Sequence, residues 1–191
     1  LQRAPFGYPE QIDEMYYDCA TGKEHLLHRA KNNYQDDGQL VKQEHYDSEN
    51  RFLYALEWKY NSHGLQIEEV NALGHAVTKK YNQWDQLIEA SDISGKFYTT
   101  FEYDGGGRLI KQTEHHPDGQ FITRYAYDGV GNKTLSVDPQ GNATRYIYDD
   151  LNHLVAVHYP DGTSERCEYN IFGHKIAVTD RSGHTTRTTY N

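Results

Sequence analysis

Hydrophobic and polar residues alternate in short runs along most of the chain. One side of residues 97–103 carries Phe97, Thr99, Phe101 and Tyr103, and one side of residues 121–127 carries Phe121, Thr123, Tyr125 and Tyr127. A period of two is typical of a β-strand, whose successive side chains point to opposite faces. No apolar stripe with a helical period lasts the length of a helix, and turn signals around residues 23–31 favour a strand there too. The pattern predicts an all-β fold.

A recurring turn motif separates these runs. Its first residue is Tyr, its second is Asp, Asn or once Gln, and Gly, Asn or Asp usually follows three positions after the second. Its copies begin at Tyr17, Tyr34, Tyr46, Tyr60, Tyr81, Tyr103, Tyr127, Tyr148, Tyr169 and Tyr190. From Tyr60 onward the steps are 21, 22, 24, 21, 21 and 21 residues. Such regular steps indicate tandem repeats.

A second turn signal lies midway in each period. It ends in Gly74, Gly95, Gly119, Gly141, Gly162 and Gly183. One period therefore predicts two strands and two turns, which is an antiparallel hairpin repeat. We expect a lead-in segment at 1–16, divergent repeats at 17–59 and regular repeats of about 21 residues at 60–191, in one continuous repeat domain.

The turn residues have physical reasons. Asp or Asn at the first turn position hydrogen-bonds the backbone two residues later, and Gly at the fourth takes a positive φ that other residues resist. Asn152 stands where Gly is usual, and Asn tolerates that conformation next best. The expected structural positions are Tyr60, Tyr81, Tyr103, Asp104, Gly107, Tyr127, Asp128, Gly131, Tyr148, Asp149, Asn152, Tyr169, Gly173 and Tyr190.

Composition and charge narrow the class of protein. Only 36% of residues are hydrophobic and mean hydropathy is -0.92, yet 17 residues are Tyr, so we expect a folded chain with a thin core. A net charge of -9 with singly scattered basic residues argues against sequence-independent binding to nucleic acid or to an anionic membrane. No apolar run is long enough to span a bilayer and the start lacks a signal-peptide layout, so we expect a soluble stretch of a longer protein.

The motifs resemble a known family. Tyr103-Asp-Gly-Gly-Gly-Arg-Leu109, the turn at Asp138–Gly141 and the next motif at Tyr148-Asp149 are similar to the YD repeat of Rhs proteins, Tc toxin C components and teneurins. The resemblance implies an antiparallel ribbon that curves or spirals into a shell, which in bacterial members encloses a toxin polypeptide. It also implies a secreted or cell-surface location, with neighbouring repeats and possibly the toxin as partners. No segment here resembles the family's self-cleaving motif, so its proteolytic and toxic activities are not carried over.

No enzyme, metal or cofactor site is expected. His25 and His28, and His115 and His116, are separated by odd numbers of residues, which places each pair on opposite faces of a strand. The acidic turn residues are explained by capping rather than by a calcium loop. No nucleophile, base and orienting group lie in one plausible site. Cys19 and Cys167 are expected to be unpaired.

The alternative function is a binding module. Tyr125, Tyr127, Tyr146 and Tyr148 could form an exposed aromatic surface for a carbohydrate or a protein at a cell surface. This hypothesis predicts that these rings are exposed and clustered, whereas a scaffold predicts that they are largely covered. We also expect unpaired edge strands to favour self-association.

Overall fold

The computed structural model describes residues 7–190, so the first six residues of the expected lead-in lie outside the described residues. Its strands are β1 (Gln11–Asp18), β2 (Lys23–Tyr34), β3 (Leu40–Tyr46), β4 (Phe52–Tyr60), β5 (Gln66–Val70), β6 (Ala76–Tyr81), β7 (Leu87–Ser91), β8 (Tyr98–Tyr103), β9 (Leu109–His116), β10 (Gly119–Tyr127), β11 (Lys133–Val137), β12 (Ala143–Tyr148), β13 (Leu154–His158), β14 (Ser164–Tyr169), β15 (Lys175–Thr179) and β16 (Thr185–Arg187). The described residues contain no helix, and the predicted all-β fold of antiparallel hairpins is confirmed.

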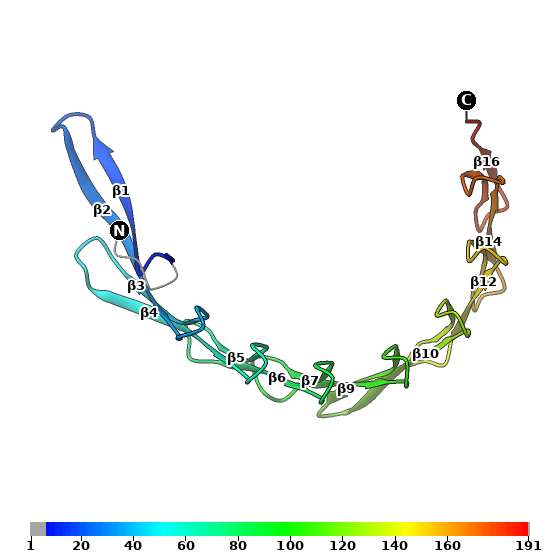
Figure 1. Cartoon of the computed structure of the whole chain (residues 1–191), viewed down its shortest axis with the longest axis horizontal. Helices are drawn as coiled ribbons and strands as arrows, with labels where there is room; N and C mark the ends of the chain where they lie inside the picture. Colours follow the sequence, from blue (N-terminus) through cyan, green and yellow to red (C-terminus); the bar gives the residue numbers. More distant parts are fainter. Residues whose placement is uncertain (1–6, 191) are drawn as a thin grey trace. The chain divides into compact units, whose positions relative to one another are not determined.

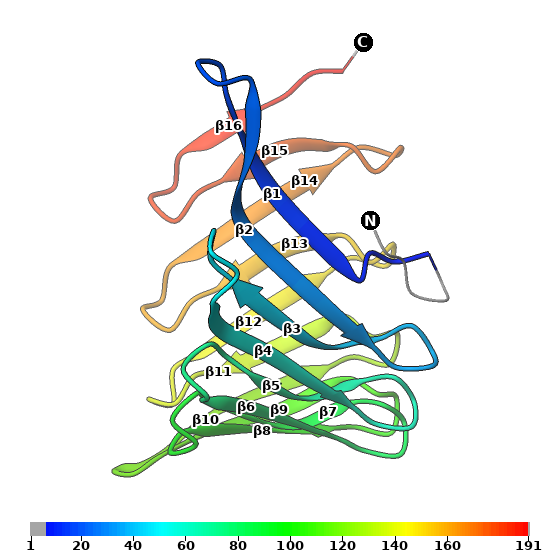
Figure 2. The same cartoon turned by 90° about the vertical axis from the view of Figure 1, so that its left-hand side faces the viewer.

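The chain divides into two compact units, residues 1–98 and 99–191. Within each unit the strands follow one another in the sheet in sequence order. In the first unit β1 to β7 lie side by side, and in the second unit the strands do the same up to β16 (Figures 1 and 2). Strand β1 begins at Gln11, inside the expected lead-in, and β2 covers the segment for which a strand was favoured over a helix.

Most hairpins share one turn geometry. At Asp104, Gly107 donates its backbone N–H to the Asp104 carbonyl over 2.9 Å, and Asp104 donates its own N–H to the Arg108 carbonyl over 3.0 Å. Gly107 has φ 79°, and this combination is a three-residue hairpin loop closed by a bulge. Asn152 takes φ 65° at the equivalent position, as the sequence predicted.

Three turns depart from this geometry. In the turn between β1 and β2, Gly22 donates its N–H to the carbonyl of Asp18, four residues before it, over 2.8 Å. The hairpin between β9 and β10 turns through Pro117 and Asp118, with Gly119 paired directly with His116. The turn that starts at Asp92 is one residue longer, because Asp92 donates its N–H to the carbonyl of Phe97 over 2.8 Å.

The turns alternate between two edges of the sheet because consecutive strands are antiparallel. We define the Tyr-turn edge by the turns that follow Tyr34, Tyr60, Tyr81, Tyr103, Tyr127, Tyr148 and Tyr169. The turn after Tyr46 joins β3 to β4 and therefore lies on the opposite edge. The short steps on both sides of Tyr46 thus arise because this copy of the motif belongs to the other set of turns.

The hydrophobic core is thin. Among the described residues, the buried hydrophobic side chains are Ala30, Val157 and Ala177, and no large side chain is fully buried. A single sheet layer leaves both faces partly wet, which matches the composition. Local hydrogen bonds and ring contacts therefore have to hold each hairpin to the next.

Candidate functional site

The repeated turn is the feature that the sequence builds most consistently. In each turn of this type that starts with Asp or Asn, the first side chain accepts hydrogen bonds from the backbone two and four residues later. Asp104 Oδ1 accepts from the N–H of Gly106 over 2.9 Å and from that of Arg108 over 3.0 Å. Asp149 does the same for Leu151 and His153, over 2.9 and 2.8 Å. The side chain thereby satisfies backbone donors that the loop leaves unpaired.

These hydrogen bonds stabilise the charged form of the turn aspartates. The backbone N–H of Arg108, followed by the Arg108 side chain, lowers the pKa of Asp104 from its ordinary value of 3.8. The backbone N–H of His153 lowers the pKa of Asp149 in the same way, and the side chain of Asn142 lowers that of Asp138. The aspartates are therefore structural anions, held ionised by the turn that they close.

The repeat tyrosines tie each hairpin to the preceding one. Tyr127 donates its hydroxyl hydrogen to the carbonyl oxygen of Leu109 over 2.8 Å, and Tyr148 donates to the carbonyl of Lys133 over 3.1 Å. In each case the acceptor is the first residue of the strand that follows the preceding turn on the Tyr-turn edge. The same bond joins Tyr60 to Leu40, Tyr81 to Gln66, Tyr169 to Leu154 and Tyr190 to Lys175.

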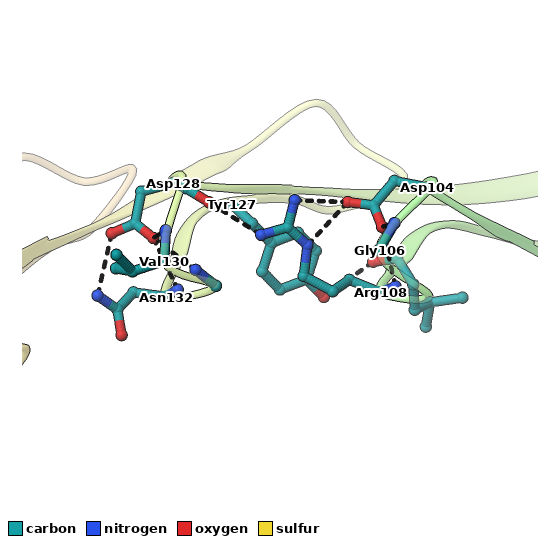
Figure 3. A network of polar contacts seen from close by, with 9 residues as sticks. Asp104, Gly106, Arg108, Tyr127, Asp128, Val130 and Asn132 are labelled. Carbon is teal, nitrogen blue, oxygen red and sulfur yellow. Dashed lines mark hydrogen bonds and ion pairs between the residues drawn. The ribbon is translucent and has the colours of Figure 1, made fainter.

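A further residue reaches forward to the next turn. We call the fifth residue after a repeat tyrosine the link residue. Arg108 is the link residue after Tyr103: its Nε and Nη2 contact Asp104 Oδ2 at 2.8 Å, and its Nη1 donates to the carbonyl of Asp128 over 2.9 Å (Figure 3). Its guanidinium also lies 5.0 Å from the centre of the Tyr127 ring. One side chain therefore joins two consecutive Tyr turns.

Other link residues achieve this connection with different chemistry. Asn132 donates its amide to Asn152 Oδ1 over 2.8 Å, and the His153 ring stacks on Tyr169 with centroids 4.6 Å apart. His174 lies 4.8 Å from the ring of Tyr190, and Gln39 donates to the carbonyl of Gly64 over 3.1 Å. The connection thus recurs at Gln39, Arg108, Asn132, His153 and His174, whereas the side chain that makes it varies.

The structure shows where the structural repeat residues and the four candidate binding tyrosines of the sequence analysis lie. Gly107, Gly131 and Gly173 have φ of 79°, 103° and 78° at the fourth turn position. The tyrosines of the structural set are half-buried, except Tyr190 at 51% exposure. Tyr125, Tyr127, Tyr146 and Tyr148 are all half-buried, and Lys133 Nζ lies 5.7 Å from the Tyr125 ring and 4.8 Å from the Tyr146 ring.

The sequence did not reveal the link residues. Their signal is a fixed position, one residue after the turn glycine, occupied by Gln39, Leu65, Gln86, Arg108, Asn132, His153 and His174. Because these side chains differ in charge and shape, no residue type recurs to mark them.

Within residues 7–190, His, Cys, Asp and Glu side chains form no group of three or more that could hold a metal ion. His28 and His45 contact each other through ring nitrogens 3.0 Å apart, and burial lowers the pKa of His45.

The same stretch contains no helix long and apolar enough to cross a membrane. Cys19 and Cys167 are free thiols.

Comparison with known proteins agrees with this geometry. The RHS repeat family matches residues 81–120 and 127–164. Two solved structures share the fold: TcdB2-TccC3-Cdc42, with 17% identity and a TM-score of 0.69, and TcdB2-TccC3 without its hypervariable C-terminal region, with 14% identity and a TM-score of 0.70. Each match covers 97% of this chain but 11% of the other. No curated protein matches the sequence.

The two RHS repeat matches cover segments in which the Tyr turns and link residues recur regularly. Residues 81–120 and 127–164 therefore match RHS repeats, the YD-repeat family that the Tyr-Asp motif resembles, and the repeated hairpins form a structural repeat scaffold.

Proposed function

We propose that this chain is a non-catalytic segment of a secreted shell wall that encloses or presents a toxin polypeptide. Its fold is similar to that of the TcdB2-TccC3 structures, of which it spans 11%. Its repeated residues are engaged in turns and in links between hairpins, which are structural roles. Its partners in this role are neighbouring repeats and the enclosed polypeptide.

The observation that carries the proposal is a row of exposed apolar side chains along the Tyr-turn edge of the second unit. Val130, Leu151 and Phe172 each occupy the third position after a repeat tyrosine, and their exposed fractions are 74%, 69% and 77%. Because the turns lie on one edge, these side chains form a series. Contiguous exposed apolar surface in a water-soluble protein marks a contact surface. A neighbouring run of the same ribbon would cover it in a closed wall.

Cysteine labelling tests whether the row is covered. Val130→Cys and Leu151→Cys would be made in a Cys19→Ser, Cys167→Ser background, both in this chain and in the longer protein with its flanking repeats. We expect thiol labelling of both positions to slow by roughly tenfold or more in the longer protein, because burial restricts access of the reagent.

The matched control is Lys80→Cys on a strand of the first unit, where the lysine side chain is 64% exposed. Its labelling should be equally fast in both proteins. Equal labelling of Val130→Cys and Leu151→Cys in the two proteins would contradict the shell-wall function and favour a free surface.

The second candidate function is recognition of a carbohydrate or protein by the tyrosine face. The grouping of Tyr125 and Tyr146 around Lys133 supports it, since a cation beside aromatic rings makes an amphipathic surface. The half-buried state of all four tyrosines favours the scaffold instead.

A glycan array separates the two candidates. A signal that Tyr125→Ala and Tyr146→Ala abolish, in variants that keep the wild-type circular dichroism spectrum, would establish binding. Variants that lose folding together with any signal would favour the scaffold.

A further inference from the structure

Four arginines recur at one position of the repeat in the second unit. Arg124, Arg145, Arg166 and Arg187 are separated by 21 residues each, and each precedes a repeat tyrosine by three positions. An odd separation places two residues of a strand on opposite faces. The arginines therefore share the face opposite the repeat tyrosines, which we call the arginine face.

Strand pairing fixes how the arginines follow one another. They lie on β10, β12, β14 and β16, with one strand between each pair. Arg124 is paired with Val137, whereas Arg145 is paired with Leu135, two residues away on β11. Arg145 and Arg166 are offset across β13 in the same way. Successive arginines thus form a diagonal row with a spacing on the order of 10 Å, from strand separations of about 4.8 Å and a rise of about 3.3 Å per residue.

The first three arginines have no partner within the described part of the chain. All four are exposed, and no side-chain hydrogen bond or ion pair engages Arg124, Arg145 or Arg166 there. Short side chains flank Arg166, which is paired with Ala156 and Thr179. Arg187 shows what the position can bind, because its Nη1 lies 3.4 Å from Glu168 Oε2.

The charge of this face differs from that of the whole chain. The chain has a net charge of -9, yet basic residues outnumber acidic ones on the arginine face. The charged strand residues of this face in the second unit are Glu102, Lys111, Arg124, Arg145, Arg166, Glu168 and Arg187. Glu102 and Glu168 are already paired with Lys111 and Arg187. The remaining positive charge belongs to the unpaired arginines.

We infer that the arginine face binds an acidic polypeptide segment that runs across β10 to β16. Guanidinium groups pair with carboxylates through two parallel hydrogen bonds, and the Arg187–Glu168 contact supplies a carboxylate in this row. An extended peptide rises about 3.3 Å per residue and its side chains alternate between two sides, so carboxylates four residues apart share one side at a spacing of about 13 Å, comparable to that of the arginines. Unpaired arginines spaced on the order of 10 Å apart are too sparse for a nucleic-acid backbone, whose phosphates recur about every 3.4 Å along a strand. This binding surface is independent of whether the wall encloses a toxin.

Peptide binding tests the inference. The probe is a fluorescent peptide with glutamate at every fourth position, titrated into the whole chain at low salt. We expect Arg124→Gln, Arg145→Gln and Arg166→Gln together to weaken its binding by roughly tenfold or more, and added salt to weaken wild-type binding, because the contacts are ionic.

The control variant combines Lys59→Gln, Lys80→Gln and Lys96→Gln, which removes the same charge from exposed positions of the first unit. Its affinity should change by less than about twofold if net charge alone is not the cause. Wild-type protein that does not bind the peptide, or equal weakening in both variants, overturns the inference. Tighter wild-type binding to single-stranded DNA than to the peptide also overturns it.

Charge reversal distinguishes loss of the binding charge from misfolding of the variant. Arg124→Glu, Arg145→Glu and Arg166→Glu together should bind a lysine-rich peptide of the same length that wild type does not bind. Circular dichroism checks that the reversal variant is folded. A folded reversal variant that binds neither peptide would contradict binding at the arginine face.

Discussion

The two units build the same hairpin turn with different side chains. Three consecutive turns of the first unit start at Asn61, Asn71 and Asn82, whereas four turns of the second start at Asp104, Asp128, Asp138 and Asp149. Both residue types accept backbone hydrogen bonds two and four residues later. The comparison shows that the repeat conserves the acceptor rather than the charge, so Asn turns and Asp turns should share their geometry but differ in their response to acid.

The residue three positions before a repeat tyrosine varies more in one part of the chain than in the other. It is Lys31, Glu57, Thr78 and Thr100 before Tyr34, Tyr60, Tyr81 and Tyr103, whereas arginine recurs before every repeat tyrosine from Tyr127 onward. Since this position lies on a sheet face and not in a turn, the turn geometry does not constrain it. Residues on this face can therefore be replaced by charged ones without changing the turns at the edges.

The largest expected effect is at a turn glycine. Gly107→Val forces a β-branched residue to a φ of 79°, which should destabilise the second unit by about 1–3 kcal/mol. Gly105→Val is the matched control, because a Cβ at Gly105 meets nothing within 4 Å and its φ is not positive. Urea unfolding of both variants measures the difference. Equal stability of the two variants would remove the turn assignment.

A smaller effect is expected at the tyrosine hydroxyls. Tyr127→Phe deletes the bond to the Leu109 carbonyl and should cost about 1 kcal/mol, as should Tyr81→Phe through the bond to Gln66 in the first unit. Tyr125→Phe keeps the same ring chemistry without a hydroxyl bond of this kind and should cost less. Thermal unfolding compares the three variants. A large loss in one unit alone would show that the hydroxyl bonds are not equivalent.

The smallest effect is the response to acid. The folded-state pKa values of Asp104, Asp138 and Asp149 lie below the ordinary value of 3.8, so their contribution to stability is complete above about pH 4. It is lost as the pH falls below 3.8 toward the folded-state values, because the unfolded chain then binds more protons. Hydrogen exchange at pH 7 and pH 3 should show selective loss of protection at the turns of Asp104, Asp138 and Asp149, compared with the turns of Asn61, Asn71 and Asn82.

Asparagine provides the control for that prediction. Replacing Asp104, Asp138 and Asp149 by Asn, as in the first unit, should remove the acid-dependent loss while leaving the backbone hydrogen bonds in place. If the substituted and wild-type turns lose protection equally at pH 3, titration of these carboxylates is not the cause.

Sequence alone predicted the features that depend on local chemistry. The hairpin turns at Asp104 and Asp128 follow from residue preferences within five positions, and the strands between them follow from alternation. The arginine face could not be predicted in this way, because basic residues scattered singly along the chain become a row only once the register is known. The bulge at Tyr127, where the pairing shifts between Ala126 and Tyr127, is one of the features that set this register.

The roles of Tyr46 and of the link residues could not be predicted from the motif alone. Tyr46 has the same motif as Tyr60, but the strand order places its turn on the opposite edge, where its hydroxyl donates to Glu44 instead of to a backbone carbonyl. The link residues were missed because Arg108, Asn132 and His153 share a position and a task but no chemistry. A pattern of residue types cannot reveal a role that different residue types fill.

Because link residues such as Arg108, Asn132 and His153 reach only the next turn, the number of repeats can change during evolution without altering the others. Removing residues 128–148 would leave Tyr127 followed by Asp149, which restores an intact motif. The same deletion brings Arg166 to the position that Arg145 held, so the arginines keep their spacing of one per repeat. Unequal recombination between copies can therefore shorten or extend such a wall without redesigning any turn.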